Sequence, residues 1–210
     1  MNSIKEMMQW RYATKKFDTS KELSDADLNY ILEAGNLAAT SYGLQPFGIV
    51  VVTDEEKKIQ LQEAAYGQAQ VGTSRALLVL CGRTDVDTDF IAAYTKNIEE
   101  TRGMDAGAVD GYKDMMTSDL TNRAPEDVTA WAVKQSYIAL GTMMVAAGEK
   151  QVDGSPMEGF DTAKFKEILG LDAHHLQPAA LLALGYRSDE DETQHYTKVR
   201  RNLEDIVVRV

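Results

Sequence analysis

The chain has 210 residues, a length that fits one domain with a complete hydrophobic core. Hydrophobic residues make up 44% and charged residues 26%, which is typical of a globular protein and argues against disorder. The net charge of −11 disfavours nucleic acid and anionic membrane surfaces as general partners, because both would be repelled.

Helical and strand patterns alternate in the first half of the chain. The predicted elements are an amphipathic helix at 24–39, a strand at 47–53, a charged helix at 54–65 and a strand at 75–81. Ser24 and Asp54 stand where helix N-caps are expected. Both strands are continuous apolar runs, so we predict that each is buried on both faces.

The second half is mainly helical. Residues 87–121 are polar with a helical pattern, and Pro125 begins a long helix at its first turn, where proline is tolerated. Between 138 and 147 this helix has almost no polar face, so either a large core or a partner chain must bury it. For a domain of this size a subunit interface is the better explanation.

The remaining predicted elements are a short helix at 160–170, a buried strand at 177–186 and an extended tail at 206–210. Helices outnumber strands and separate them, which indicates an α+β or α/β arrangement in three layers. Repeats and linkers are not visible, so we expect residues 1–210 to form a single domain.

Cysteine and histidine usage limits the chemistry. The single Cys81 excludes an internal disulfide and any metal site built from several thiolates. The histidines at 174, 175 and 195 lack HExxH spacing, so we predict no metal site. A secretion signal is not visible, and no apolar run approaches the roughly 18 residues of a membrane span. We therefore expect a cytoplasmic protein without a membrane partner.

Two segments concentrate positive charge on this acidic chain: residues 11–15 (RYATK) and 198–201 (KVRR). Arginine and lysine together suit a phosphate group, although two solvated surface patches are an equally simple explanation. The motifs GxSxG, GxGxxG and GxxxxGK[ST] are absent, which argues against a hydrolase elbow, a Rossmann site and a P-loop. Any phosphorylated cofactor would have to be held by cationic side chains.

Four blocks occur in order along the chain: RYATKKFD at 11–18, GLQPF at 43–47, PMEGFD at 156–161 and KVR at 198–200. Together they resemble the sequence blocks of the FMN-dependent nitroreductase family, from about residue 3 to the C-terminus. The resemblance implies a three-layer α/β/α fold with a mainly antiparallel sheet. It also implies a homodimer with active sites at the subunit interface and a C-terminal tail that extends to the partner subunit.

The resemblance assigns roles to individual positions. The FMN phosphate would be held by Arg11, Ala13, Lys198 and Arg200, and Tyr12 would line the same end of the site. Lys15 would reach the pyrimidine edge of the flavin, where a cation favours the reduced, anionic form. Two departures stand out: Ala13 replaces a frequent serine, and Gly67 removes a side chain next to Gln70, which could still contact the ring.

Further cofactor contacts are implied in the loop over one flavin face, from Pro156, Glu158 and Gly159. Contacts from the second subunit are implied for Thr40, Ser41 and Tyr42, with Gln135 reaching the site from the long helix. No catalytic side chain is expected, because the flavin carries the chemistry.

The implied activity is reduction of nitroaromatics, quinones or similar acceptors with NADH or NADPH, by a ping-pong mechanism through FMN. Two alternatives remain open: a non-catalytic flavin-binding protein, and a related flavin enzyme with different chemistry, such as dehalogenation or flavin fragmentation. Residues 87–121 could be a lid of such an enzyme or the wall of a substrate channel.

Overall fold

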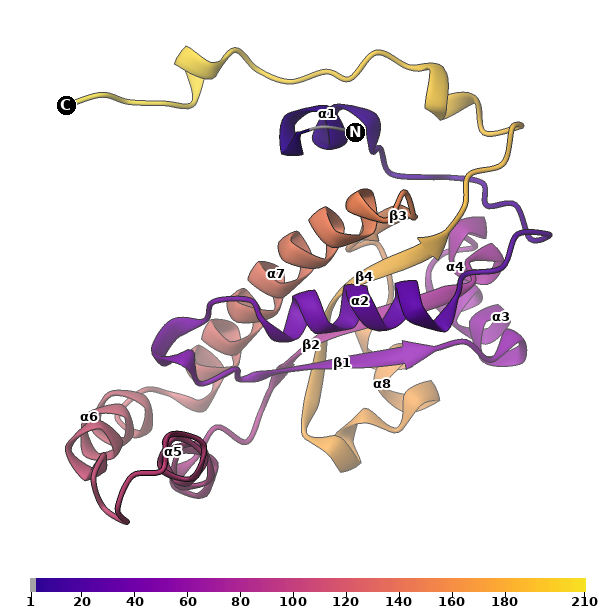
Figure 1. Cartoon of the computed structure of the whole chain (residues 1–210). Helices are drawn as coiled ribbons and strands as arrows, with labels where there is room; N and C mark the ends of the chain where they lie inside the picture. Colours follow the sequence, from indigo (N-terminus) through magenta and orange to yellow (C-terminus); the bar gives the residue numbers. More distant parts are fainter. Residues whose placement is uncertain (1–2) are drawn as a thin grey trace.

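A four-stranded antiparallel sheet forms the centre of the computed structural model, which describes residues 3–210 (Figure 1). Its strands are β1 (Phe47–Val52), β2 (Ala76–Arg83), β3 (Asp153–Met157) and β4 (Leu176–Gly185), in the order β1-β2-β4-β3. The two central strands, β2 and β4, are almost completely buried, as predicted. The two edge strands, β1 and β3, differ from the sequence-based expectation.

The prediction that β1 is buried on both faces is wrong. Most of its residues are only half-buried, and Val51 is 40% exposed. The strand stands at the sheet edge, where one side has no neighbouring strand among the described residues. β3 was not predicted, because its sequence, DGSPM, contains glycine and proline, which are rare inside strands and tolerated at edges.

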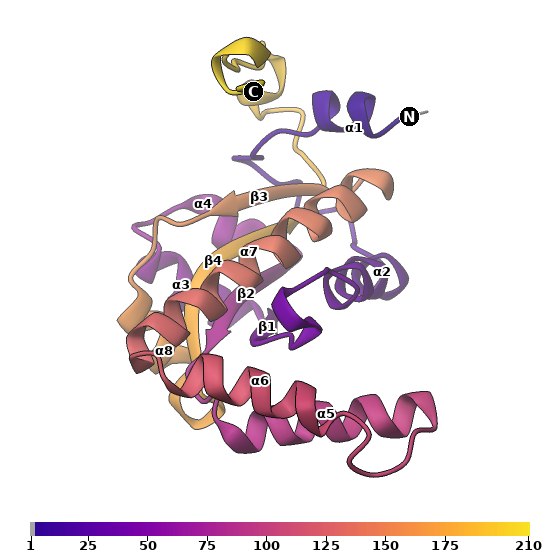
Figure 2. The same cartoon turned by 90° about the vertical axis from the view of Figure 1, so that its left-hand side faces the viewer.

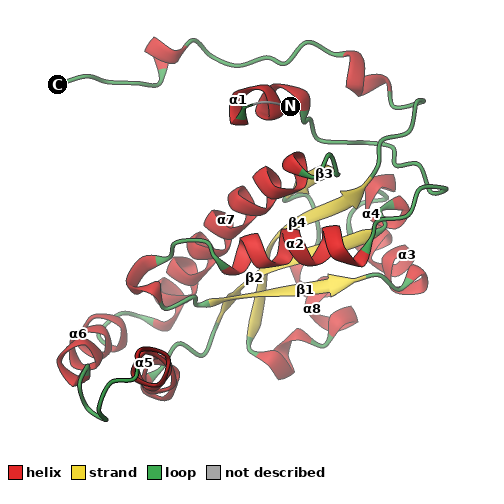
Figure 3. Ribbon diagram, viewed as in Figure 1, coloured by secondary structure: helices red, strands yellow, loops and turns green. Residues whose placement is uncertain are grey.

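Eight α-helices accompany the sheet among residues 3–210 (Figure 3). They are α1 (Ile4–Trp10), α2 (Asp25–Asn36), α3 (Glu55–Ala64), α4 (Ala69–Thr73), α5 (Thr88–Arg102), α6 (Asp110–Thr121), α7 (Pro125–Glu149) and α8 (Thr162–Leu169). The predicted caps are confirmed, since Ser24 Oγ accepts from the Asp27 N–H and Asp54 Oδ1 from the Lys57 N–H. The short α1 and α4 were not predicted.

The sheet separates two hydrophobic cores, which confirms the three-layer arrangement. Alternation along β2 divides its side chains: Leu78 and Leu80 face α2 and α7, whereas Leu77 and Val79 face α3, α4 and α8. Figure 2 shows α7 running along the sheet, with α3 and α8 on the far side. The fold is therefore α+β with helices on both faces of an antiparallel sheet.

The long helix α7 is not buried all round by this chain. Ala139, Met143 and Ala147 are buried in the core, but Ile138 is 45% exposed. One stripe of α7 therefore remains open to contact with another molecule.

Among residues 3–210, no helix is both long and apolar enough to cross a membrane.

Residues 87–121 form the pair α5 and α6, which pack against each other at the end of the molecule remote from α1 (Figure 1). After β4 the chain becomes extended and passes across α1 towards the C-terminus, with short 3₁₀ turns at Glu192–His195 and Leu203–Asp205 (Figures 1 and 2). The predicted extended tail is confirmed. Its apolar side chains are largely exposed: Tyr196, Val199, Leu203, Ile206, Val208 and Val210.

Candidate functional site

Three cations from opposite ends of the sequence converge beside α1. Lys198 Nζ donates a hydrogen bond to Met8 O at 2.5 Å and another to Arg11 O, which fixes the C-terminal segment to the end of the helix. The pKa of Arg11 is lowered by burial and then by the charge of Arg200, with Asp153 acting in the opposite sense. The pKa of Lys198 is lowered by burial and by the charges of Arg11 and Arg200. The three groups are thus close enough to repel one another.

Within residues 3–210, none of these three cations forms a salt bridge to a carboxylate. Arg200 is exposed, and its Nη1 donates only to Val199 O, at 2.7 Å. Lys15 is also exposed, four residues along the chain from Arg11. The charge of Asp153 offsets the repulsion in part at Arg11, and a group of neighbouring cations of this kind attracts anions.

A buried carboxylate holds the segment that carries Tyr12 and Lys15. Asp191, 3% exposed, accepts hydrogen bonds from the Tyr12 hydroxyl at 3.0 Å, from the Lys15 N–H at 2.8 Å and from the Lys16 N–H at 3.1 Å. Burial raises its pKa, but the hydrogen bonds from Thr193, the two backbone amides and Tyr12 outweigh burial and lower the pKa to about 2. Sequence reasoning missed Asp191, which lies far along the chain from Tyr12.

A second anchor holds the same segment. The guanidinium of Arg187 is bound by the carboxylate of Asp153 on β3, with Nε at 2.9 Å from Oδ1, and lies over the rings of Trp10 and Tyr12. Ala13 forms an isolated parallel bridge to Gly154, next to Asp153. The backbone of residues 10–16 is therefore fixed between the edge strand and the segment that follows β4.

The structure brings Gln70 to the loop that follows β3. Gln70 Nε2 contacts Met157 Sδ and Gln68 Oε1, both at 3.2 Å, and Gln68 Nε2 donates to Gly159 O at 2.6 Å. Pro156 and Met157 end the strand, and the Phe160 N–H donates to Glu158 O, which closes a tight turn. Gln68 was not among the predicted site residues, although it lies within the segment 67–70 that the sequence analysis singled out.

A pocket of about 360 Å³ opens beside this turn. It is lined by Tyr137, Leu140, Pro156, Met157, Glu158 and Ala180. Burial, followed by the hydrogen bond to Glu158, raises the pKa of Tyr137 to about 12, so this phenol stays protonated at any physiological pH. Its hydroxyl also lies 3.1 Å from Ala179 O.

The residues predicted to act across a subunit boundary form a separate group. The Ser41 N–H donates to Gln135 Oε1 at 2.9 Å, and Thr40 and Tyr42 flank Ser41 in a turn before β1. α1, by contrast, packs on the other end of α7, where a Cβ at Gly148 would meet Met7 Sδ. From residue 135 to residue 148 the helix rises about 20 Å. Within one chain, therefore, these residues do not meet the cations.

Comparison with known proteins identifies the family. A model described as the nitroreductase family matches residues 8–186. A candidate NAD(P)H nitroreductase of Staphylococcus haemolyticus is 34% identical over 99% of each chain, and YfkO, a candidate NAD(P)H nitroreductase of Bacillus subtilis, is 34% identical over 97% of this chain and 96% of its own.

Solved structures agree in fold. The candidate nitroreductase YdfN of Bacillus subtilis superposes with a TM-score of 0.88 at 22% identity over 98% of each chain. A candidate nitroreductase of Exiguobacterium sibiricum, solved in complex with FMN, superposes with a TM-score of 0.86 at 23% identity, covering 100% of this chain and 98% of its own. On the family match and on relatives at 34% identity across nearly the whole length, the chain belongs to the nitroreductase family.

Proposed function

We propose that this chain is one FMN-binding domain of a homodimeric oxidoreductase that uses NADH or NADPH to reduce nitroaromatics, quinones or similar acceptors. The observation that carries the proposal is the convergence of Arg11, Lys198 and Arg200 with no internal carboxylate partner. A phosphate monoester dianion matches this demand, because guanidinium forks bind its oxygens in pairs and an ammonium adds a compact charge. Relatives at 34% identity are named as candidate NAD(P)H nitroreductases.

The residues of the site fit FMN beyond its phosphate. Lys15 adds a further cation on the same segment. The carboxylate of Asp191 accepts a hydrogen bond from the Lys15 N–H and so fixes the backbone from which this side chain projects. Gln70 supplies a buried amide beside the 156–159 turn, where polar groups of a flavin ring would need partners. Bound FMN would supply two-electron redox chemistry, which no side chain of the chain provides.

The protein's own contribution is binding, orientation and charge. Lys15 would stabilise negative charge at the pyrimidine edge of the ring, and the turn at Glu158 and Gly159 would cover one of its faces. Acceptor and nicotinamide would then use one open slot in turn, which is the basis of a ping-pong scheme. Solvent can supply the protons, so we assign no obligate acid or base.

Three features support a homodimer. Thr40–Tyr42 lies about 20 Å along α7 from the end where the cations gather, so only a second chain can bring the two groups together. α7 exposes Ile138, and the extended tail exposes apolar side chains from Tyr196 to Val210. We propose that the tail packs on the partner subunit, since exposed apolar stretches of this length mark contact surfaces.

The test is flavin content followed by turnover. The purified protein is expected to be yellow, to release FMN on denaturation and to oxidise NADH or NADPH when a quinone or nitroaromatic is added. Protein without flavin, which also fails to take up added FMN, would refute the proposal. Bound FMN without turnover would instead favour the non-catalytic alternative.

A further inference from the structure

One backbone carbonyl of the turn before β1 binds both helices of the α5–α6 pair. Tyr94 on α5 and Tyr112 on α6 both donate their hydroxyl hydrogen bonds to Tyr42 O, each at 2.8 Å. One helix of the pair thus supplies one donor, and the next helix supplies the other. Their common acceptor belongs to the turn that follows α2.

Tyr42 is held by its side chain as well. Its hydroxyl donates to Asp119 Oδ2 on α6 at 2.6 Å, and Asp119 is paired with Arg123 at 2.6 Å. The hydrogen bond to Asp119, followed by burial, raises the pKa of the Tyr42 phenol. Its ring lies 6.3 Å from that of Tyr112 and 6.4 Å from that of Trp131. Tyr42 therefore contacts α6 and α7 at the same time as α5.

The backbone of this turn is strained, which shows that its shape is imposed by these contacts. Tyr42 has a φ of 60°, in the left-handed region that a bulky residue rarely occupies. Gly43 follows with a φ of 67°, and a Cβ at this position would lie 2.6 Å from the Tyr94 hydroxyl oxygen. The phenol thus approaches the main chain more closely than any residue with a side chain would allow.

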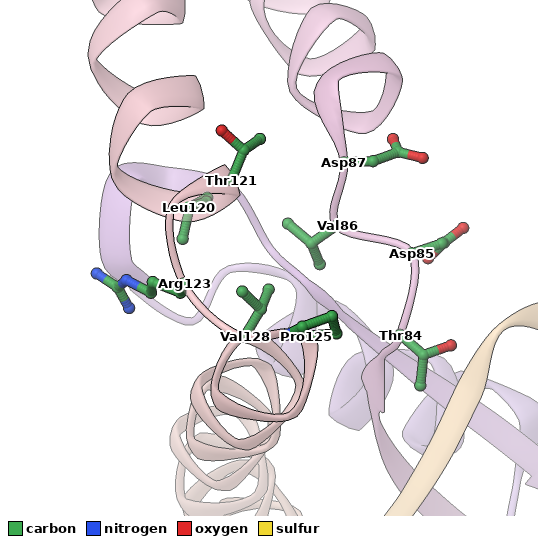
Figure 4. A pocket seen from close by; sticks show the side chains of 9 residues that line it. All are labelled: Thr84, Asp85, Val86, Asp87, Leu120, Thr121, Arg123, Pro125 and Val128. Carbon is green, nitrogen blue, oxygen red and sulfur yellow. The ribbon is translucent and has the colours of Figure 1, made fainter.

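The two segments that connect α5–α6 to the body contribute hydrophobic packing. Figure 4 shows the pocket of about 300 Å³ between them, with Val86 on the segment that enters α5 and Leu120 and Val128 on the segments around the α6–α7 junction. Val86, Leu120 and Val128 belong to one buried hydrophobic cluster with Leu44, Ile91 and Met116. Tyr42 packs against this cluster, so its hydrogen bonds to the helix pair act together with hydrophobic contacts.

The strained turn leads directly to the predicted interface residues. The Gly43 N–H donates to Thr40 O at 2.9 Å, and Ser41 is fixed by Gln135. Any shift of Tyr42 must pass to Thr40 and Ser41, because the three residues share one hydrogen-bonded turn.

We infer that Tyr94 and Tyr112 are positioning residues, which lock Tyr42 and so hold the 40–42 backbone in the shape that lines the acceptor slot of the partner subunit. The α5–α6 pair then sets acceptor affinity without touching the cofactor phosphate site. This inference rests on the proposed function, because residues 40–42 line a slot only in the dimer.

The test removes both hydroxyls in the double variant Tyr94→Phe/Tyr112→Phe. Tyr30→Phe is the matched control: it deletes a phenol that donates to Glu149 at 2.7 Å, between α2 and α7 and away from the turn. In the double variant we expect hydrogen exchange of the amides at 41–45 to be faster by about tenfold or more. We also expect the KM for a quinone acceptor to rise by about fivefold or more, with kcat and FMN content within about twofold of wild type.

Tyr30→Phe should leave all four quantities unchanged. Exchange rates in the double variant equal to those of Tyr30→Phe would overturn the inference, and so would faster exchange with an unchanged acceptor KM. Wild-type protein without turnover would refute the oxidoreductase proposal separately. The exchange comparison, which needs no flavin, would then decide alone whether the two phenols anchor Tyr42.

Discussion

Removing Arg200 should weaken FMN binding while leaving the flavin-free protein intact. A charge-assisted hydrogen bond to phosphate contributes about 1.5–3 kcal/mol, which corresponds to a loss of roughly 10- to 150-fold in FMN affinity for Arg200→Ala. In the flavin-free chain, the removal of Arg200 should affect stability in the opposite direction. Arg200 lowers the pKa of Arg11 and Lys198, so its removal relieves repulsion and should not lower the melting temperature.

The assay is a titration of flavin-free protein with FMN at two ionic strengths. Quenching of the flavin fluorescence reports binding. Arg201→Ala provides a matched control, because it removes the neighbouring guanidinium of the same exposed segment, which donates to Asp205 O. Weaker binding by Arg200→Ala, with Arg201→Ala unchanged, would support the assigned phosphate site. If Arg200→Ala and Arg11→Ala both bind FMN as tightly as Arg201→Ala, the reasoning from converging charge is refuted.

Three further outcomes are expected. Because the pKa of Asp191 is about 2 in the folded chain, against an ordinary 3.8, its carboxylate stabilises the fold by about 2 kcal/mol above pH 4, and this contribution disappears as the pH falls from about 4 to 2. Urea unfolding of Asp191→Asn across this range should show a flatter acid limb than wild type; an unchanged limb would contradict the assignment. Burial raises the pKa of the Cys81 thiol to about 12, so a thiol reagent at pH 8 should label it only after unfolding; rapid labelling of the folded chain would contradict its place in β2. Ile138→Asp should halve the molar mass measured by light scattering and lower FMN retention, whereas Ile59→Asp, on the exposed face of α3, should not; a dimeric Ile138→Asp would exclude this stripe of α7 from the interface.

Local signals in the sequence were sufficient for the elements that depend on local interactions. Ser24 and Asp54 indicated where α2 and α3 begin because an N-cap bonds within its own first turn. The apolar runs of β2 and β4 indicated central strands. The same reasoning failed for β1, whose apolar residues give no information about which strand stands at an edge. β3 escaped because an edge strand of five residues with Gly154 and Pro156 depends on pairing with β4 for its conformation.

The residues of the site also divide into those that the sequence indicated and those that it did not. Arg11 and Arg200 were recognisable as an anomaly of charge, and the order of the sequence blocks suggested that they meet. Asp191, Tyr137 and Gln68 were missed because their roles come from contacts across the fold: Asp191 bonds to Tyr12 over 179 positions, and Gln68 to Gly159 over 91. Gly67 and Gln70 drew attention to the segment that contains Gln68, but nothing near Asp191 along the chain marks it as different from other polar residues.

The two tryptophans of the chain lie in the two regions that the proposals concern, the cation cluster and the α5–α6 pair. The indole of Trp10 lies 4.3 Å from the Arg187 guanidinium carbon, beside the cation cluster, and Trp131 lies against Tyr42, below the α5–α6 pair. Replacing either indole by phenylalanine would therefore leave a single tryptophan at one end of α7 or the other. Emission from Trp10 would follow occupancy of the cation cluster, and emission from Trp131 would follow movement of the helix pair, so each event can be timed by stopped flow in its own single-tryptophan variant.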